Sequence, residues 1–350
     1  PLKRNIIMCR DITVGVSGGV DSAVCVMMLK NAGYRVTGVM LGMYGNDEKA
    51  AAGLSIKLGI PVIYRDVADK FEEAVIRPFI EGLMSGATPS PCTICNPTVK
   101  WREIKAVAEE TGSNMWATGH YCRITEHDGK RYVTRGIDPV KDQSYYLWRL
   151  DDELLSGASM PLGDSFKSDI KDFATRNGLG DIASERESMG VCFFGSDGYA
   201  SLLRSRCHAS GIGEGDVRDA SGITVARHKG FPFYTVGQKR GLDIPAGMCV
   251  TNIDAATNTI YIGRPEELYT DSITLTDTSI RDAGEFFASD RMTVSVRGIG
   301  RNPDGFVKVR KEGDKIVVKM TGRGAWAACK GQPAVFYIDD RVVGGGIVCG

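Results

Sequence analysis

The sequence predicts an α/β protein in which a doubly wound parallel sheet is followed by small antiparallel β domains, the last of them a β-barrel. Up to about residue 148, short β-branched apolar runs alternate with segments whose apolar residues recur every three or four positions. This alternation is typical of the strands and helices of a parallel sheet. From about residue 211, short runs of alternating apolar and polar residues are separated by polar turns, which indicates antiparallel strands.

The same patterns predict the individual elements and their grouping. We expect strands at 11–16, 35–41, 61–65 and 114–120, and helices at 20–32, 47–58, 70–85 and 98–111. Hairpins are expected at 251–263, 307–320 and 335–346, and the stretch from about 150 to 195 should be helical and linker-like. We therefore expect three domains, at 1–195, 196–275 and 276–350.

Composition limits the class of protein. Lysine plus arginine and aspartate plus glutamate both number 43, so no overall charge indicates a nucleic-acid partner, although a local basic face is compatible with this balance. The sequence shows no apolar leader and no apolar run near the ~18 residues that span a bilayer, so we expect a soluble protein. Its ten scattered cysteines lie mostly in apolar runs, which favours buried thiols in a reducing compartment, the cytoplasm.

The stretch VSGGVDS, residues 16–22, joins the first expected strand to the first expected helix. A glycine-rich turn that opens a helix directs backbone N–H groups at one point, where the helix dipole also favours negative charge. Phosphate suits such a point, and Asp21 would face it through a divalent cation such as Mg²⁺. A glycine-rich turn without any ligand is the alternative.

Neither common phosphate-loop pattern fits, because no lysine follows these glycines and G-x-G-x-x-G is absent. The stretch instead resembles the SGGxDS signature of the N-type ATP pyrophosphatases, the PP-loop superfamily. This resemblance implies that ATP is split to AMP and pyrophosphate while a carbonyl oxygen is adenylated.

Three cysteines lie in surroundings that are not simply apolar. Cys92 and Cys95 stand in TPSPCTICNPTVKW, residues 88–101, in what we expect to be a proline-stiffened loop at the mouth of a helix, where a helix N-terminus lowers a thiol pKa. Cys192 stands between glycines in SMGVCFFGSDG, residues 188–198, although a cysteine beside two phenylalanines also fits a core position. Three thiols in two loops beside an ATP-activating loop suggest sulfur transfer.

Seven motifs in order resemble the tRNA-specific 2-thiouridylases over nearly the whole chain. They are SGGVDSAV (17–24), TPSPCTICN (88–96) with Lys100, ATGHY (117–121), KDQSYYL (141–147), GVCFFG (190–195), YTVGQKRGL (234–242), and GQPAVFY (331–337) with GGGIV (344–348). The resemblance implies ATP-dependent thiolation of the tRNA wobble uridine at position 2. It also implies a PP-loop catalytic domain with a helical tRNA-binding extension at 1–195, a central β-rich domain at 196–275 and a C-terminal barrel at 276–350.

The resemblance also assigns roles to individual residues. Cys192 would carry a persulfide, and Cys95 would release the sulfur by closing a transient disulfide with it. The residues implied to bind ATP are Gly15, Val16, Ser17, Gly18, Gly19, Val20, Asp21, Ser22, Leu41 and Gly119. Those implied to contact tRNA are Ser90, Pro91, Cys92, His120, Lys141, Asp142, Gln143, Arg297, Gly298 and Gln332.

One residue departs from the family pattern. The family often has aspartate where this chain has Cys92, which removes the expected general base. An alternative therefore stays open, in which Cys92, Cys95 and Cys192 hold an iron–sulfur cluster with one iron free to bind sulfide. Structural zinc is disfavoured because the chain has no second C-x-x-C pair. The segment after Met43 is also shorter than is usual in the family.

Two other functions compete with thiolation. An adenylating amidotransferase or ligase of the same superfamily would need no Cys95 or Cys192, and a non-catalytic tRNA-binding protein would need neither ATP nor thiols. The resemblance implies glutamate, glutamine and lysine tRNAs as substrates. It also implies a persulfide donor, either a cysteine desulfurase or a sulfur-relay protein, and we expect a monomer.

Overall fold

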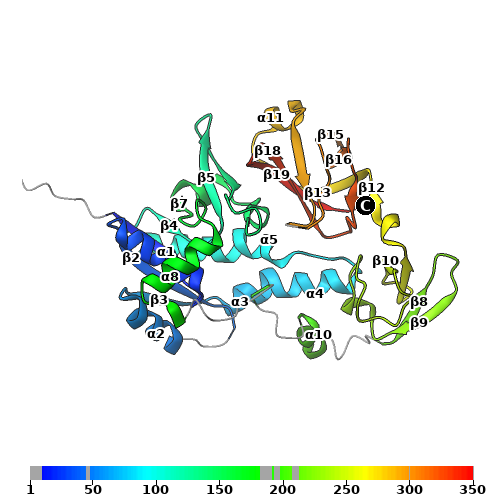
Figure 1. Ribbon diagram of the computed structural model, residues 1–350, viewed down its shortest axis with the longest axis horizontal. Helices are drawn as coiled ribbons and strands as arrows, with labels where there is room; N and C mark the ends of the chain where they lie inside the picture. The colour runs from blue at the N-terminus through cyan, green and yellow to red at the C-terminus, as the bar shows by residue number, and fades with distance from the viewer. Residues whose placement is uncertain are drawn as a thin grey trace, which may run out of the picture. The chain divides into compact units, whose positions relative to one another are not determined.

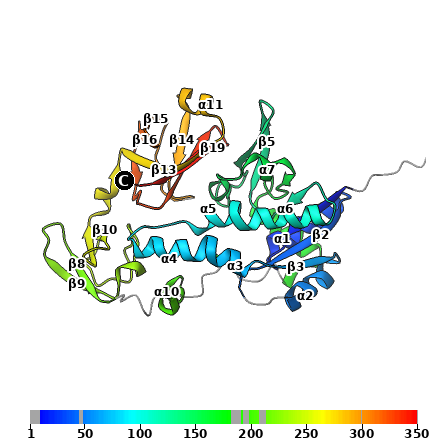
Figure 2. The ribbon, with the colours of Figure 1, turned by 180° about the vertical axis from the view of Figure 1, so that it is seen from behind.

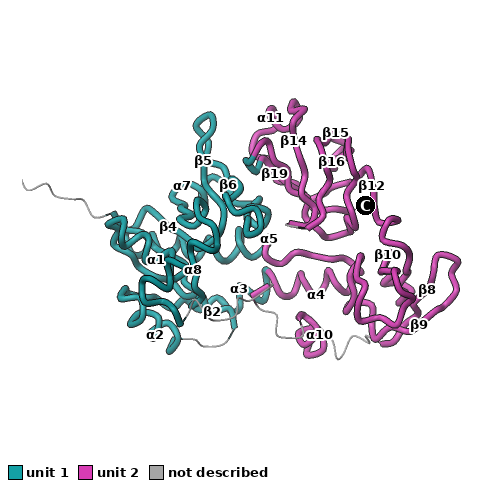
Figure 3. Tube along the Cα trace, in the orientation of Figure 1, with its two compact units in different colours: residues 1–74, 94–187, 340–342 teal, residues 75–93, 188–339, 343–350 magenta. Residues whose placement is uncertain are grey.

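The computed structural model describes residues 10–44, 48–181, 191–192, 198–206, 213–298 and 300–349. The domain boundary expected at 195/196, most of the GVCFFG motif and part of the segment after Met43 lie outside these residues. The chain divides into two compact units, coloured in Figure 3. Unit 1 comprises residues 1–74, 94–187 and 340–342, and unit 2 comprises 75–93, 188–339 and 343–350. The three-domain division stays a prediction.

Unit 1 is built around a parallel sheet (Figure 1). Its strands lie in the order β3-β2-β1-β4-β7, and every neighbouring pair is parallel. The elements of the sheet and its connections are β1 (Asp11–Gly15), α1 (Val20–Asn31), β2 (Arg35–Gly42), α2 (Glu48–Leu58), β3 (Val62–Asp66), α3 (Ala68–Phe71), α6 (Trp101–Glu110), β4 (Trp116–Ala117), α7 (Asp152–Ser156), β7 (Ala158–Ser159) and α8 (Lys167–Arg176).

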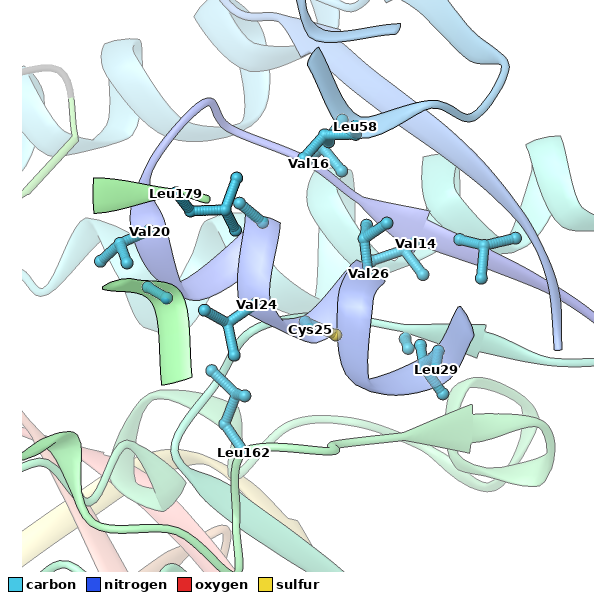
Figure 4. Packing of buried hydrophobic residues seen from close by; sticks show 14 of the residues in the cluster. Val14, Val16, Val20, Val24, Cys25, Val26, Leu29, Leu58, Leu162 and Leu179 are labelled. Carbon is cyan, nitrogen blue, oxygen red and sulfur yellow. The ribbon is translucent and has the colours of Figure 1, made fainter. Parts of the chain in front are cut away.

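Alternate residues of β1 face opposite sides of this sheet. Ile12 and Val14 belong to the core cluster that α1 and α8 cover, shown close up in Figure 4. On the other face, a Cβ at Gly15 would come within 2.6 Å of Ile104 in α6. Helix α6 is labelled in Figure 2, which views the ribbon from behind. Helices on both faces make the sheet doubly wound, as the alternating pattern predicts.

The expected strands and helices of this unit are confirmed, with three corrections. The strand predicted over 114–120 is only Trp116–Ala117, because the chain leaves the sheet at Thr118 to close over the start of α1. The helix predicted over 70–85 is confirmed as a continuous helical run, made of α3, a π-helical turn η1 (Glu72–Ile76) and α4 (Arg77–Met84). The sequence reading also missed a hairpin, β5 (Cys122–His127) and β6 (Lys130–Arg135).

The third correction concerns Cys92 and Cys95, which lie inside a helix and not in a loop before it. Helix α5 spans Pro91–Cys95, continues as the π-helical turn η2 (Asn96–Lys100) and then becomes α6. Pro91 can begin the helix because a first helical residue needs no N–H partner. The wider π turn accommodates Pro97, which cannot donate to the preceding turn.

Unit 2 is mostly β structure. A four-stranded sheet has the order β10-β11-β8-β9, and a larger sheet follows the path β14-β18-β19-β13-β16-β15. The three predicted hairpins are confirmed, but β8 and β11 pair in parallel, which the antiparallel prediction did not include. The remaining elements are η3 (Ser144–Leu147) in unit 1, and α10 (Ala200–Arg206), β8 (Gly215–Arg218), β9 (Thr224–His228), η4 (Phe231–Phe233), β10 (Cys249–Asp254), β11 (Thr259–Gly263), η5 (Pro265–Leu268), β12 (Tyr269–Thr270), β13 (Ser272–Ile280), α11 (Ala283–Ala288), β14 (Met292–Ser295), β15 (Val307–Glu312), β16 (Lys315–Met320), β17 (Ala325–Trp326), β18 (Pro333–Ile338) and β19 (Arg341–Val348).

Within the described ranges, no helix is both long enough and apolar enough to cross a bilayer.

Candidate nucleotide site and reactive thiols

The loop between β1 and α1 is held in one shape by its own hydrogen bonds. The backbone N–H of Val16 donates to Val39 of β2 at 2.9 Å, which keeps the loop at the carboxyl end of the sheet. The Ser22 hydroxyl donates to the carbonyl of Gly19 at 2.9 Å and accepts from the Ser17 N–H at 3.2 Å. Gly18 has φ of +82°, a conformation that favours glycine.

This shape leaves the N-terminus of α1 open to a ligand. The N-cap is Gly19, and no side chain caps the helix. The N–H groups of Val20, Asp21 and Ser22 are the first of the helix and have no carbonyl in a preceding turn to donate to. A Cβ at Gly18 would meet only Leu54, at 4.0 Å, so the loop has room beside it. Open N–H groups and the helix dipole fit the phosphates of a nucleotide.

Asp21 carries the only carboxylate of this loop, and its Oδ1 has two donors. The Tyr121 hydroxyl and the Lys167 ammonium each lie 2.6 Å from it. The Asp21 side chain is 36% exposed, so it remains accessible beside the open helix end. Mg²⁺ prefers oxygen ligands, so an accessible carboxylate beside a candidate phosphate site suits this ion.

Gly119 forms a wall of the same site. A Cβ there would lie 3.0 Å from the backbone carbon of Asp21 and 3.1 Å from the N–H nitrogen of Ser22. Leu41 is half-buried near the carboxyl end of β2. All ten residues implied to bind ATP therefore belong to unit 1, on β1, the loop after it, the first turn of α1, β2 and the segment that follows β4.

Side-chain hydrogen bonds join four of the sequence motifs within unit 1. Tyr121 of ATGHY donates to Asp21 of the glycine-rich loop, and its backbone exchanges two hydrogen bonds with Gln143 of KDQSYYL, at 3.0 and 2.9 Å. Asn96, next to Cys95, donates from Nδ2 to the Tyr146 carbonyl of KDQSYYL at 3.1 Å. The phosphate loop and the segment that begins at Cys95 are thus connected through one set of contacts.

Asp142 is buried and organises the KDQSYYL loop. Its carboxylate accepts from the Gly136 and Ser144 N–H groups, each at 3.1 Å, and from the Ser144 hydroxyl at 2.8 Å. Arg135 adds an ion pair at 3.3 Å. These contacts shape the loop that presents half-buried Lys141 and Gln143, while a direct contact of Asp142 with tRNA stays a prediction.

His120 is half-buried and electrically neutral near pH 7. Its ring stacks on Trp101 at 6.1 Å between centroids, and its Nδ1 lies 2.6 Å from the Thr118 hydroxyl. Burial, and then the charge of nearby Lys100, lower the pKa of His120 from about 6.5 to about 3. A neutral imidazole can make a hydrogen bond to RNA, but it offers no positive charge to a phosphate.

This low pKa predicts a pH dependence of stability. Between pH 6.5 and about 3 the unfolded chain protonates His120 while the folded chain does not, so the free energy of unfolding should fall as the pH is lowered through this window. Urea unfolding of the protein and of His120→Gln, compared at pH 7.5 and 5, isolates this contribution from that of the carboxylates. A pH effect of the same size in both proteins would contradict the assignment.

The three cysteines differ in exposure. Cys192 is exposed, Cys92 is half-buried and Cys95 is only 6% exposed, and all three are reduced thiols. Cys92 and Cys192 belong to unit 2 and Cys95 to unit 1. Among the residues the structure describes, no group of three or more His, Cys, Asp or Glu side chains is arranged to hold a metal ion. The cluster therefore stays an untested alternative.

The remaining residues implied to contact tRNA lie in unit 2. Ser90 precedes α5, and its carbonyl accepts from the Thr93 hydroxyl at 2.8 Å. Arg297 lies over the Trp326 ring at 5.0 Å and donates to the Ala327 carbonyl at 3.2 Å. Gln332 is buried, and its Oε1 accepts from the Cys329 N–H at 3.2 Å. Their roles toward RNA stay predictions.

The motifs did not reveal two residues of the candidate nucleotide site. Tyr121 lies inside a motif but was given no role, and Lys167 lies outside every motif, as the first residue of α8. Alternation along the chain predicts where α8 packs, but not which carboxylate a lysine at its start will meet. Only the folded chain brings residues 21, 121 and 167 together.

Comparison with known proteins gives three family-model matches that together cover most of the chain. Residues 10–196 match the family model of the tRNA methyl transferase HUP domain, residues 204–264 that of the tRNA methyl transferase PRC-barrel domain, and residues 271–348 that of the aminomethyltransferase beta-barrel domain. The last two matches cover the β-rich part of the chain, which agrees with the predicted fold class.

Several curated proteins are similar over nearly their full length. The tRNA-specific 2-thiouridylase MnmA 3 of Bacteroides fragilis is 35% identical over 341 residues, which cover 96% of this chain and 93% of that protein. The MnmA 3 of Phocaeicola vulgatus is 35% identical, with 96% and 94% covered. The tRNA-specific 2-thiouridylase MnmA of Chlorobium luteolum is 34% identical, with 97% and 96% covered.

Proposed function

The chain belongs to the family of tRNA-specific 2-thiouridylases, and from this premise we propose that it catalyses the ATP-dependent 2-thiolation of the wobble uridine of tRNA. It would thus act as a sulfurtransferase. The observation that carries the proposal is the set of contacts that joins the phosphate loop, through Tyr121 and the KDQSYYL loop, to the helix next to Cys95. An adenylating enzyme of another branch would have no use for a thiol connected in this way.

In the first step, the uracil O2 attacks the α-phosphorus of ATP, and pyrophosphate leaves. The open N–H groups at the start of α1 would bind the phosphates, and Gly18 lets the backbone approach them closely. Asp21 would hold Mg²⁺, which supplies positive charge against the phosphates when bound. Gly119 closes the site next to the first turn of α1.

In the second step, the terminal sulfur of a Cys192 persulfide attacks C2 of the activated uridine, and AMP leaves. The Cys95 thiolate then attacks the Cys192 sulfur, so that the bond to the transferred sulfur breaks and a Cys95–Cys192 disulfide forms. An external thiol reductant returns both cysteines to thiols. The exposure of Cys192 suits a carrier that a separate persulfide donor must reach, and the burial of Cys95 suits a partner that acts only within the protein.

Further details of the proposal come from the family resemblance. Ser90, Pro91 and Cys92 would contact the target base once it has left the anticodon stack. His120, Lys141, Asp142, Gln143, Arg297, Gly298 and Gln332 would contact the rest of the tRNA. The substrates would be glutamate, glutamine and lysine tRNAs, and the sulfur donor a cysteine desulfurase or a relay protein. We place the enzyme in the cytoplasm, as a monomer.

The direct test uses an unmodified wobble-uridine tRNA transcript with ATP, Mg²⁺ and a persulfide donor. We expect 2-thiouridine by mass spectrometry of the digested tRNA, with one AMP and one pyrophosphate formed for each sulfur transferred. A tRNA with cytidine at the wobble position is the control and should remain unmodified. ATP cleavage without sulfur incorporation, or tRNA binding without ATP cleavage, would overturn the proposal in favour of a ligase or a binding protein.

Cys92 separates the persulfide route from the iron–sulfur alternative. In the persulfide route, Cys92 makes no bond to the transferred sulfur and contributes only one of several contacts with the target base, so Cys92→Ala should keep thiolation within about threefold of the parent protein, a change below ~1 kcal/mol in the barrier. The assay compares metal-free protein with anaerobically reconstituted protein. Activity that requires reconstitution and disappears in Cys92→Ala would mean instead that the three cysteines hold a cluster.

A further inference from the structure

Lys167 is a buried cation at the candidate nucleotide site. Its side chain is 10% exposed, its ammonium donates to Asp21 Oδ1 at 2.6 Å, and it lies 5.4 Å from the centre of the Tyr121 ring. An ammonium is strongly hydrated, so its burial needs compensation by a nearby negative charge. In this structure Asp21 supplies that charge.

Asp21, by contrast, does not need a lysine. As the second residue of α1 it lies in the first turn, where the helix dipole and the open N–H groups already favour a negative charge, and the Tyr121 hydroxyl donates to it as well. The Lys167 ammonium therefore brings more positive charge to the start of α1 than is needed to neutralise the Asp21 carboxylate. The surplus suits a ligand with several negative charges, which a pyrophosphate group is.

The backbone of Lys167 is held in place by hydrogen bonds, whereas its ammonium lies at the end of a long, flexible side chain. The Lys167 N–H donates to Asp138 Oδ2 at 3.0 Å, and the other oxygen of Asp138 accepts from the Val140 N–H at 3.0 Å. Asp138 thereby fastens the start of α8 to the loop that continues into KDQSYYL. The four-carbon stem of a lysine allows its ammonium to change partners while the backbone stays in place.

We propose that Lys167 binds the β- and γ-phosphates of ATP and is kept on Asp21 until the nucleotide arrives. The ammonium then exchanges the carboxylate for phosphate oxygens, and Asp21 becomes available to the cation that accompanies the nucleotide. Lys167 would stabilise the pyrophosphate as it leaves. The identity of the ligand as ATP rests on the proposed function, and the part assigned to Lys167 rests on its contacts.

Ligand binding without tRNA tests this assignment. Calorimetry would measure the dissociation constants of pyrophosphate, a non-hydrolysable ATP analogue and AMP for the parent protein, Lys167→Met, Lys167→Arg and Lys171→Met. Lys171 is an exposed residue of the same helix and serves as the matched control. We expect Lys167→Met to weaken the binding of pyrophosphate and of the ATP analogue at least about tenfold, and to change the binding of AMP less than about twofold. Lys167→Arg should recover part of the lost affinity.

A purely structural role for Lys167 gives a different pattern. The Asp21–Lys167 pair would then stabilise the fold. The loss of Lys167 would weaken the binding of AMP and of the ATP analogue by the same factor, or would leave both affinities unchanged. Either result overturns the proposal.

Asp21→Asn provides a second variant that keeps the lysine. It should bind pyrophosphate more tightly than the parent protein when no divalent cation is present, because Lys167 is released and a negative charge is removed. Weaker binding would show that the ammonium depends on Asp21 and would also overturn the proposal.

These outcomes are separable from those of the thiolation assay. A parent protein that binds the ATP analogue but transfers no sulfur refutes the proposed function, and the Lys167 result still stands for the nucleotide site. A parent protein that thiolates tRNA while Lys167→Met binds pyrophosphate normally refutes the Lys167 assignment alone.

Discussion

Cys192→Ala is expected to reduce tRNA thiolation at least about a thousandfold, because the nucleophile that carries the sulfur is removed. ATP binding should not change, since Cys192 makes no bond to the nucleotide in the proposed reaction. Thiolation is followed as 2-thiouridine in digested tRNA, and nucleotide binding by calorimetry. Cys192→Ser should fail equally, because a hydroxyl cannot form a persulfide.

Cys349→Ala is the matched control for Cys192. Cys349 is a half-buried thiol of unit 2 whose Sγ lies 3.4 Å from the Thr274 carbonyl, and no step of the proposed reaction uses it. Its replacement should leave thiolation close to that of the parent protein. If Cys192→Ala keeps substantial activity with a persulfide donor, another residue carries the sulfur and the assignment of the carrier is wrong.

Gly119→Ala should weaken ATP binding at least about tenfold, equivalent to ~1.4 kcal/mol. The added Cβ would lie 3.0 Å from the backbone carbon of Asp21 and 3.1 Å from its carbonyl oxygen, closer than carbon atoms normally pack. The neighbouring atoms are backbone, so the first turn of α1 must move by a few tenths of an ångström, which displaces the N–H groups that would bind the phosphates. Gly119 does not have a positive φ, so the effect is one of space alone.

Gly53→Ala is the control for this substitution. Gly53 lies in α2 of the same unit, and a Cβ there meets no atom within 4 Å, so ATP binding should not change. Circular dichroism of Gly119→Ala checks that the fold is retained. Unchanged ATP affinity in a folded Gly119→Ala protein would mean that the nucleotide does not bind against the first turn of α1.

The sequence was sufficient for the core of the fold because apolar periodicity reports burial directly. The run from Ile12 to Val16 and the pattern of α1 predicted a strand and a helix that the structure confirms as β1 and α1. Short elements were harder to predict. The strand at Trp116–Ala117 is set by pairing with β1, and its two residues carry too little periodicity to mark its ends. The parallel pairing of β8 with β11 depends on contacts between segments far apart in the chain.

The β5–β6 hairpin was missed although the sequence contains a signal for it. Residues 122–135 read CRITEHDGKRYVTR, and Asp128-Gly129 is a dipeptide typical of a two-residue hairpin turn. Both residues have positive φ, and His127 pairs with Lys130 across the turn. The hairpin interrupts the strand–helix alternation of the surrounding chain, which is why that alternation does not predict it.

The candidate site divides in the same way. The glycine-rich loop could be recognised because the residues that make it are consecutive, and Ser17, Gly18 and Ser22 interact with one another. The structural roles of Asp142 and Lys167 could not be recognised from the sequence, because their hydrogen-bond partners come from other segments of the chain. The low pKa of His120 likewise depends on its burial in the fold and on the charge of Lys100, which stands about twenty residues earlier.

Three residues near the end of the chain belong to unit 1. Residues 340–342 group with it, and within that unit Asp340 accepts from the Arg135 N–H at 2.9 Å while Arg341 pairs with Thr134 of β6. Domains usually fold one after another as the ribosome releases them. Here the N-terminal unit cannot acquire its last contacts until residues 340–342 have been translated, after residues 188–339 of unit 2. Synthesis of most of unit 2 therefore precedes completion of the unit that contains the glycine-rich loop.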